Sequence, residues 1–268
     1  SFGASALLLG ARRLPKFDVV IGSSPQILAG AIAQIIAQRQ RIPFVLEVRD
    51  LWSAAIGSLG GIGRGAVARS VAMLEQLLYR QASRVVVVTE GARQHLIAEG
   101  LPEHRVHCIP HGVDLSLFTE VHRESQAQRD HYLCGYLGKH GLAQGLSTVL
   151  QCADLLTPAS ALRFLLVGDG PEKALRQRRA SERALSPVGF LGARPRELVP
   201  ALWTSLDACV VPLRRDPALR FAVPSKIFEA MATETPVVSC ASPEANARVE
   251  KVGAGLAVEP EDAPGLAR

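Results

Sequence analysis

The sequence predicts an α/β fold of two Rossmann-like domains, each a doubly wound parallel sheet, facing each other across a cleft. Short runs rich in Val, Ile and Leu alternate with helical patterns along the chain, as parallel strands joined by right-handed helical crossovers require. The four consecutive valines at 85–88 are apolar on both faces, which is typical of a strand covered by helices on both sides. A polar segment near the middle interrupts the alternation and divides it in two.

The first half of the chain contains four predicted strands, at residues 18–21, 44–48, 84–88 and 105–109. The helical patterns between them cover residues 25–39, 65–81 and 91–99. In a parallel sheet of this kind, functional side chains gather where the strands end, so the residues that follow each strand are the first candidates for a site.

The polar segment runs from residue 111 to about residue 131. Its residues 120–130 are charged and show no sustained apolar period, so they are predicted to form a connector. The alternation then restarts, with strands predicted at residues 132–136, 163–167, 188–191, 208–211, 236–240 and 255–258. We therefore expect one domain at residues 1–120 and a second at residues 121–268.

The composition allows two cores and excludes several classes of protein. A chain of 268 residues with 48% hydrophobic and 21% charged residues has an ordinary globular balance. The net charge of +5 comes from scattered basic residues, and only 5% of residues are aromatic, so no nucleic-acid stacking surface is expected. A modest positive charge suits anionic small molecules or an anionic membrane face.

The cysteines, the metal-binding motifs and the ends of the chain carry further expectations. The five cysteines are far apart and form no C-x-x-C pair, which predicts free thiols in a reducing cytoplasm and no zinc site. No D-x-D motif is present, so we expect no metal. No apolar run is long enough to span a membrane. The chain lacks an initial Met and stops where a helical pattern begins, which indicates a piece of a longer protein.

The segment from Val223 to Met231 is the most informative motif, because it is a short loop followed by a predicted helix start. Ser225 is placed to cap the first helical amides, Lys226 lies beside them, and Glu229 follows one turn later on the same side. A helix start with a cation binds phosphate, and a carboxylate accepts hydrogen bonds from sugar hydroxyls. The alternative is an ordinary capped helix that buries its apolar residues.

A glycine-rich turn follows the first predicted strand of the second half. Gly138 and Gly141 allow backbone to approach a ligand closely, and the amides before the following helix are expected to point at that ligand. Lys139 and His140 add a cation and a titratable donor, although spacing does not decide which of them points inward. The alternative is a tight turn that only needs glycine.

Two other glycine motifs are read as structural. The Gly168-Asp169-Gly170 segment fits a sharp strand-to-helix turn, with Pro171 suited to the first helical position. Residues 63–68 match the dinucleotide pattern G-x-G-x-x-A but follow no strand, so we reject that motif.

Charged residues follow the predicted strand at 44–48, where Arg49 and Asp50 are expected to face the cleft. The alternative is an Arg49–Asp50 ion pair at the sheet edge with Trp52 packed beneath it. Glu47 lies inside the strand and is expected to pair with a neighbour. His111 precedes a glycine in a turn, where local hydrogen bonds are more common than a role as catalytic base.

These segments, in this order, resemble the retaining glycosyltransferases of family four, which have the GT-B architecture, and most of all those that assemble bacterial surface polysaccharides. The most specific segments are His140-Gly-Leu-Ala-Gln-Gly-Leu146 and Pro224-Ser-Lys-Ile-Phe-Glu229. Further resembling segments lie at residues 17–21, 47–52, 109–114 and 167–170. The resemblance implies that residues 1–120 form an incomplete acceptor-side domain. It also implies that residues 121–268 bind a nucleotide sugar, often UDP-linked, and lack a final helix.

The resemblance also implies roles for individual residues. Glu229 matches the second glutamate of the family's Glu-x7-Glu element, which holds the ribose, whereas the first glutamate is replaced by Phe221. Backbone amides, Ser225 or Lys226 are expected to fill that place. The diphosphate contacts fall on Lys226 and on the turn at residues 138–141. Arg49 and Asp50 stand where many relatives have a histidine close to the acceptor and the donor sugar.

The expected function is transfer of a sugar from a nucleoside diphosphate to a glycan or polyprenyl-linked acceptor, with retention and without metal or cofactor. The expected location is the cytoplasm, with peripheral contact at the inner membrane face through a lipid-linked acceptor. The alternatives are a nucleotide-sugar epimerase on the same fold and an inactive nucleotide-binding fragment.

Overall fold

The computed structural model describes residues 15–24, 26–51, 65–118, 130–156 and 160–268. The chain divides into two compact units, Ser1–His111 and Gly112–Arg268, and each is described by itself. The division falls ahead of residue 120, where the sequence placed it.

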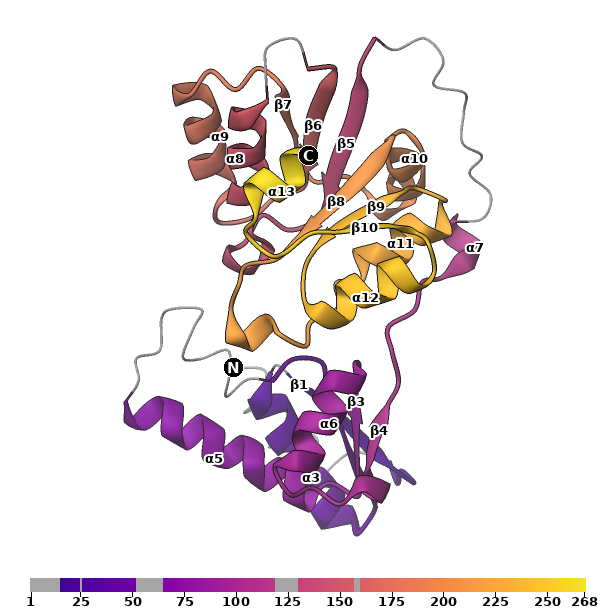
Figure 1. The fold of residues 1–268 in the computed structure, drawn as a ribbon. Coiled ribbons are helices and arrows are strands. Elements are labelled where there is room, and N and C mark those ends of the chain that lie inside the picture. Colours follow the sequence, from indigo (N-terminus) through magenta and orange to yellow (C-terminus); the bar gives the residue numbers. More distant parts are fainter. Residues whose placement is uncertain (1–14, 25, 52–64, 119–129, 157–159) are drawn as a thin grey trace. The chain divides into compact units, whose positions relative to one another are not determined.

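The first unit contains a four-stranded parallel sheet with the order β1-β2-β3-β4 (Figure 1). The strands are β1 (Val20–Ser24), β2 (Phe44–Val48), β3 (Arg84–Val87) and β4 (Val106–Cys108). The helices are α3 (Ile27–Gln40), α5 (Ala66–Gln81) and α6 (Glu90–Ala98), with a 3-10 turn η2 (Glu103–Arg105) before β4. The predicted strands and helices are therefore confirmed, with ends displaced by a few residues. The largest displacement is at β1, which begins two residues and ends three residues later than predicted.

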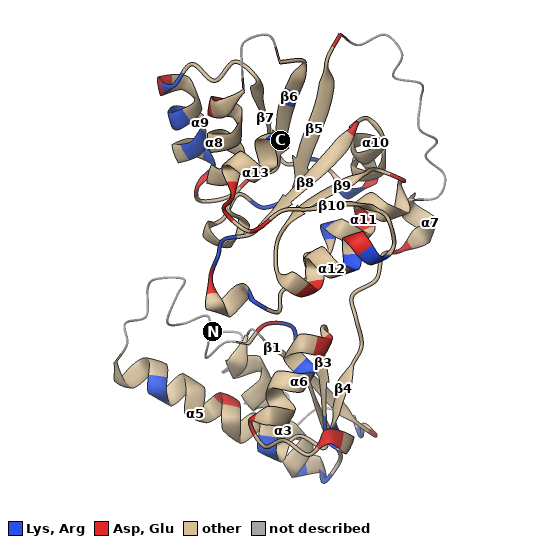
Figure 2. Ribbon diagram, viewed as in Figure 1, with Lys and Arg blue, Asp and Glu red and all other residues tan. Residues whose placement is uncertain are grey.

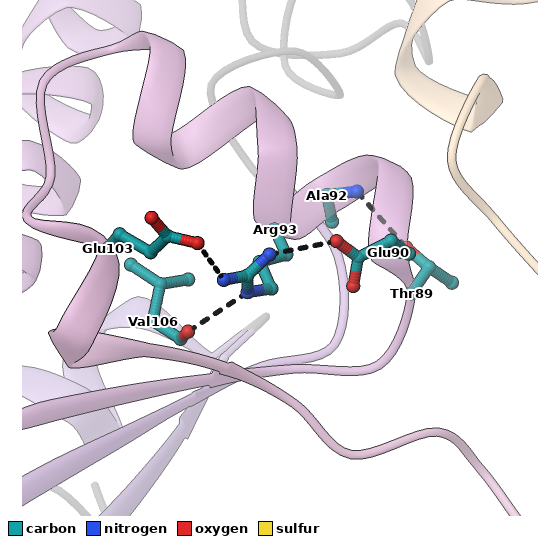
Figure 3. Close-up of polar contacts among 6 residues, drawn as sticks. All are labelled: Thr89, Glu90, Ala92, Arg93, Glu103 and Val106. Atoms are coloured by element: carbon teal, nitrogen blue, oxygen red, sulfur yellow. Dashed lines mark hydrogen bonds and ion pairs between the residues drawn. The ribbon is translucent and has the colours of Figure 1, made fainter.

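Arg93 of α6 forms contacts that join this helix to β4, the strand that follows it (Figure 3). Thr89 caps α6 by accepting a hydrogen bond from the amide of Ala92. The Arg93 guanidinium forms ion pairs with Glu90 at 2.9 Å and Glu103 at 2.7 Å, and donates to the carbonyl of Val106 at 3.2 Å. These contacts fix the register of α6 against η2 and β4.

The second unit contains a six-stranded parallel sheet with the order β10-β9-β8-β5-β6-β7. The strands are β5 (Tyr132–Leu137), β6 (Leu162–Val167), β7 (Val188–Leu191), β8 (Ala208–Pro212), β9 (Val237–Cys240) and β10 (Gly255–Ala257). All six predicted strands are confirmed. The order of the strands reverses between β5 and β8, which is the place where open α/β sheets bind ligands.

Helices cover both faces of this sheet (Figure 1). They are α8 (Ser147–Leu155), α9 (Lys173–Glu182), α10 (Val199–Thr204), α11 (Lys226–Ala232), α12 (Pro243–Lys251) and α13 (Ala263–Ala267), with 3-10 turns η3 (Leu142–Gln144), η4 (Arg196–Leu198) and η5 (Pro217–Leu219). Two apolar clusters result, one containing Trp203 and Ile227 and the other containing Tyr136 and Phe164.

The segment predicted to be polar and turn-rich from residue 111 contains regular structure. Residues Leu115–Phe118 form the short helix α7, and Phe118 is buried in the same cluster as Trp203 and Ile227. The prediction of a polar, turn-rich segment was therefore wrong for these residues, because Leu117 and Phe118 pack into the second unit. The charged stretch expected at residues 120–130 lies outside the described residues, apart from Asp130.

The turns after β5 and β6 pack directly on each other. The His140 amide donates to the Asp169 carbonyl at 2.7 Å, and the Glu172 amide donates to the His140 carbonyl at 3.0 Å. Gly168 and Gly170 have φ angles of 142° and 153°, which only glycine adopts readily. The turn-forming roles of residues 168–170 are therefore confirmed, but Gly168 and Asp169 also line the cavity described below, which the structural interpretation did not include. Pro171 was placed wrongly, because α9 begins only at Lys173.

Charges are spread over both units, with basic residues grouped on α9 (Figure 2). All five cysteines are free, and four are buried. In the described ranges no helix is long and apolar enough to cross a membrane, and no cluster of His, Cys, Asp or Glu could hold a metal ion.

We predict that Gly170→Ala destabilises the protein by about 1–3 kcal/mol or more, because the strained φ adds to a close contact. A methyl group at this position would lie 2.5 Å from the His140 carbonyl oxygen. Gly192→Ala is the matched control, since nothing lies within 4 Å of its added methyl group. Urea unfolding of both variants measures the difference, and equal midpoints would contradict the close packing of the two turns.

Candidate functional site

A cavity of about 490 Å³ lies where β5, β6 and β7 end and α11 begins. Its charged lining consists of four cations and two carboxylates: Lys139, Arg194, Arg196, Lys226, Asp169 and Glu229. The lining therefore has a formal excess of two positive charges. Such a cavity attracts an anion of about two negative charges.

Lys226 lies at the centre of this arrangement. Its Nζ atom is 3.8 Å from the centre of the Tyr136 ring, which is a cation–π contact. Gly138 has a φ angle of 144°, and a methyl group added there would be only 2.8 Å from Nζ. The absence of a side chain at Gly138 therefore makes room for the ammonium group.

The surroundings of Lys226 shift its proton equilibrium. Burial lowers the pKa of Lys226 to about 7, because the charged form loses hydration, while Cys209 and Glu229 oppose the shift. Among the described residues, no carboxylate forms an ion pair with this ammonium group. Lys226 therefore carries a charge that a bound anion would stabilise.

Glu229 is held by Arg196, which also lines the cavity, and by Trp203, which is buried and does not line it. Arg196 forms an ion pair with Oε1 at 3.3 Å, and the Trp203 indole donates to Oε2 at 3.3 Å. Each carboxylate oxygen retains a second lone pair. Glu229 is thus oriented and can still accept hydrogen bonds from a ligand.

Ser225 lines the cavity but does not cap α11. Its backbone is helical, with φ at −59° and ψ at −25°, whereas a capping residue needs an extended backbone to turn its side chain back. The predicted cap was therefore wrong. The exposed Ser225 hydroxyl remains available to a ligand.

The turn at residues 138–141 resolves the alternative between Lys139 and His140. Lys139 is exposed and lines the cavity, whereas His140 is fully buried and packs between the rings of Tyr136 and Phe190. Burial, followed by the charge of Arg176, lowers the pKa of His140 to about 4, so its ring is neutral.

Two amides of this turn that were expected to face a ligand are used within the protein. The His140 amide donates to Asp169, and the Gly141 amide donates to the Gln144 side chain at 3.1 Å. The prediction of outward-pointing amides was therefore wrong for His140 and Gly141. Gly141 also does not line the cavity, whereas Gly138 does.

Phe221, at the position where the resemblance places the family's first glutamate, is not among the residues that line this cavity. The Arg220 guanidinium lies 4.4 Å from the centre of its ring. Phe221 therefore presents an aromatic face to a neighbouring cation and offers no carboxylate to a sugar.

Arg49 and Asp50 belong to the first unit, where both are exposed after β2. The carbonyl of Asp50 accepts a hydrogen bond from the Ser24 hydroxyl at 3.3 Å. Although Asp50 as a whole is exposed, loss of hydration at its carboxyl group raises its pKa, and the positive charges of Arg49 and His111 oppose this. The alternative of a direct Arg49–Asp50 ion pair is not seen among the described residues, and Trp52 lies outside them.

Glu47 and His111 complete this cluster in the first unit. Glu47 accepts a short hydrogen bond from the Ser23 hydroxyl, which confirms the expected pairing. His111 makes no hydrogen bond with the described residues, so the expected local bonds are absent. Its pKa is lowered by burial and by Arg49, with Glu47 and Asp50 opposing.

The sequence analysis missed two residues of the cavity and two that contact its lining. Arg194 and Arg196 follow β7, so the rule that sites form at strand ends could have identified them. Tyr136 contacts Lys226 and lies two residues before Gly138, so it could have been found from its place at the end of the strand. Trp203 carried no signal, because its contact with Glu229 depends on how α10 packs against α11.

Comparison with solved structures identifies proteins of similar fold. HepE of Anabaena, solved in complex with UDP, has a TM-score of 0.73 with this chain at 19% identity, covering 99% of this chain and 70% of its own. The fold is that of the GT-B glycosyltransferases.

Sequence comparison then defines the family. Residues 1–112 match the glycosyl transferase 4-like domain, and residues 131–268 match the glycosyl transferases group 1. The chain belongs to the glycosyl transferases group 1 family. The putative colanic acid biosynthesis glycosyl transferase WcaI of Escherichia coli is 26% identical over 283 residues, covering 99% of this chain and 69% of WcaI. The 2-deoxystreptamine glucosyltransferase of Streptomyces kanamyceticus is 24% identical, covering 96% of this chain and 68% of its own.

We predict that Lys226 titrates near neutral pH, at about 7, in the protein without ligand. Carbon NMR of labelled lysine side chains, with Lys226→Met to assign the signal, measures this directly. A Lys226 signal that titrates near the ordinary lysine value of about 10.4 would contradict the enclosed ammonium group.

Proposed function

We propose that the full protein transfers a sugar from a UDP-sugar to a glycan or polyprenyl-linked acceptor, with retention, in the assembly of a surface polysaccharide. The observation that carries the donor assignment is the cation-rich cavity at the ends of β5, β6 and β7, with Lys226 and Glu229 on its walls. Its positive excess matches a diphosphate, and Glu229 supplies acceptor atoms for ribose hydroxyls.

Lys226 is assigned to the diphosphate. When the bond to the sugar breaks, negative charge grows on the leaving diphosphate, and a fixed cation in an enclosed site stabilises that charge. Lys139 and Arg194, which also line the cavity, add positive charge. We assign this role to side chains rather than to a divalent cation, so activity should persist in EDTA.

Glu229 is assigned to the ribose, and Ser225 to a polar contact beside it. The Trp203 indole and Arg196 hold the carboxylate in place before a ligand arrives, so little ordering is needed on binding. Gly138 supports the site indirectly by leaving space for Lys226.

Arg49 and Asp50 of the first unit are assigned to the acceptor reaction. A carboxylate with a raised pKa is suited to accept a proton from an acceptor hydroxyl, and Asp50 has that property. Arg49 supplies a neighbouring positive charge.

The relatives support this choice of donor and process. HepE binds UDP and glucose in its solved complexes, and WcaI is named for the biosynthesis of colanic acid. A polyprenyl-linked acceptor implies action at the cytoplasmic face of a membrane through peripheral contact.

We predict that Lys226→Ala lowers kcat/KM by about 100- to 1000-fold, as expected for loss of one group that stabilises developing charge. Glu229→Ala should raise the Kd for UDP by about tenfold or more, because charge-assisted hydrogen bonds to the ribose are lost. Exposed Lys251→Ala and Glu250→Ala are matched controls that should behave as wild type.

Turnover of UDP-sugars by the full-length protein with a lipid-linked acceptor provides these rates. Wild-type rates in both Lys226→Ala and Glu229→Ala would refute the donor-site assignment. Conversion of the donor sugar without any acceptor would instead identify an epimerase.

We predict that UDP affinity decreases as pH rises above 7. Lys226 with a pKa of about 7 is charged below this pH and neutral above it, so the charged form that attracts the diphosphate disappears. If binding requires the charged form, Kd rises by roughly tenfold between about pH 6.5 and pH 8. Calorimetry should show proton uptake on binding, and Lys226→Met should remove the uptake. An equal uptake in this variant would contradict the assignment.

We predict that Asp50→Asn lowers kcat by about 100-fold or more, as loss of a general base does, while UDP affinity stays unchanged. Glu99→Gln is the control, since this exposed carboxylate lies on the same unit. A parallel loss of UDP affinity in Asp50→Asn would show that Asp50 acts on the donor instead.

A further inference from the structure

Four buried side-chain nitrogens have no hydrogen-bond partner among the described residues, and all belong to His140 and Arg176. His140 belongs to the turn after β5, and Arg176 of α9 contacts the same turn, whose Gly138 and Lys139 line the proposed donor site. Buried polar groups are nearly always paired, so four unpaired nitrogens at one turn call for an explanation.

Arg176 contacts this turn through its guanidinium. The residue is only 2% exposed, and its Nη2 atom donates a hydrogen bond to the Gly141 carbonyl at 3.3 Å. The same atom forms a short ion pair with Glu172, whose amide donates to the His140 carbonyl. One side chain and its ion-pair partner therefore hold two consecutive residues of the turn.

The other side of the turn faces the donor cavity. Gly138 and Lys139 line that cavity, whereas Arg176 does not. The Tyr136 hydroxyl also donates to the Lys139 carbonyl at 2.7 Å, so the ring that contacts Lys226 is joined to the same turn. A shift of the turn would therefore move Lys139 and the room that Gly138 leaves for Lys226.

We propose that Arg176 is a positioning residue, which holds the turn at residues 138–141 in the conformation that the nucleotide sugar requires. This inference rests on the proposed function. Arg176 acts through the Gly141 carbonyl and through Glu172, and it does not touch the donor.

The alternative is that Arg176 only stabilises the packing of α9. The two accounts differ in what an apolar replacement does. Replacing a buried ion pair by apolar side chains is often neutral or stabilising for the fold, whereas removing one partner alone leaves the other charge unpaired. In Arg176→Met the remaining partner is Glu172, whose side chain is 22% exposed and stays partly hydrated, so the cost to the fold is limited. A positioning role predicts weaker nucleotide binding in such a variant without loss of stability.

The test uses the full-length protein, with UDP as the probe in calorimetry and UDP-sugars in turnover. Arg176→Met should raise the Kd for UDP and the donor KM by about tenfold, while the acceptor KM and the unfolding temperature stay near wild type. Arg176→Lys retains the charge but loses the planar fork, so it should restore part of the affinity. Arg179→Met, at an exposed position of the same helix, should bind as wild type.

The state of His140 gives a second measurement. Next to burial, the charge of Arg176 is the largest cause that lowers the His140 pKa, with further lowering by Lys173 and Lys226 and opposition from Asp169. In Arg176→Met the His140 pKa measured by NMR should therefore rise from about 4, and in Arg179→Met it should not.

The outcomes separate this inference from the proposed function. If wild type binds UDP and Arg176→Met binds it within about twofold, Arg176 has no positioning role. If donor and acceptor KM rise together with a lower unfolding temperature, and Arg176→Lys rescues neither, the residue is structural only. If wild type itself does not bind UDP or any other nucleotide, the proposed function fails, and the inference fails with it. If Arg176→Met does not fold, Arg176→Lys and Glu172→Gln decide by the same comparison.

Discussion

The enclosure of one ammonium group is the constraint on which the second unit depends. Lys226 lies against the Tyr136 ring, and Gly138 must lack a side chain for Lys226 to lie there. The positive φ of Gly138 follows from the sharp turn after β5, and the turn after β6 packs against it in turn. The conformation of the two turns, the glycine at position 138 and the place of the Lys226 ammonium group therefore depend on one another. A charge held in so little water is expensive without a counter-ion and effective with one.

The same physics explains why the cavity favours an anion although the protein as a whole is only moderately basic. Charges scattered over exposed helices are screened by solvent and salt, as on most of the surface in Figure 2. The cations of the cavity converge on one partly enclosed volume, where screening is weaker. The attraction of the cavity for an anion therefore depends on where the cations lie and not on how many the chain contains. For this reason the net charge of the chain carries little information about the ligand.

The fold could be predicted from the sequence almost completely, because buried parallel strands have unmistakable apolar runs and all ten were found. The site could be predicted only where the signal was local. Lys226 and Glu229 follow from their spacing on one helix, whereas the neutral, buried state of His140 depends on Phe190 of another strand. The missing Ser225 cap depends on a backbone angle that the residue type does not determine. Side-chain direction in a turn is set by tertiary packing, and propensities do not contain it.

The order of the strands has a consequence for how the protein folds. Strand β5 pairs with β6, which follows it closely, and also with β8, and the Leu133 amide bonds the Asp207 carboxylate 74 residues further along the chain. Contacts of such long range close late and slowly, because chain entropy must be lost before they form. Tyr136 lies on β5 and Lys226 follows β8 in the chain, so these two strands must come together before the ammonium group can reach the Tyr136 ring. The polypeptide must therefore complete its most distant pairing before the lining of the cavity exists.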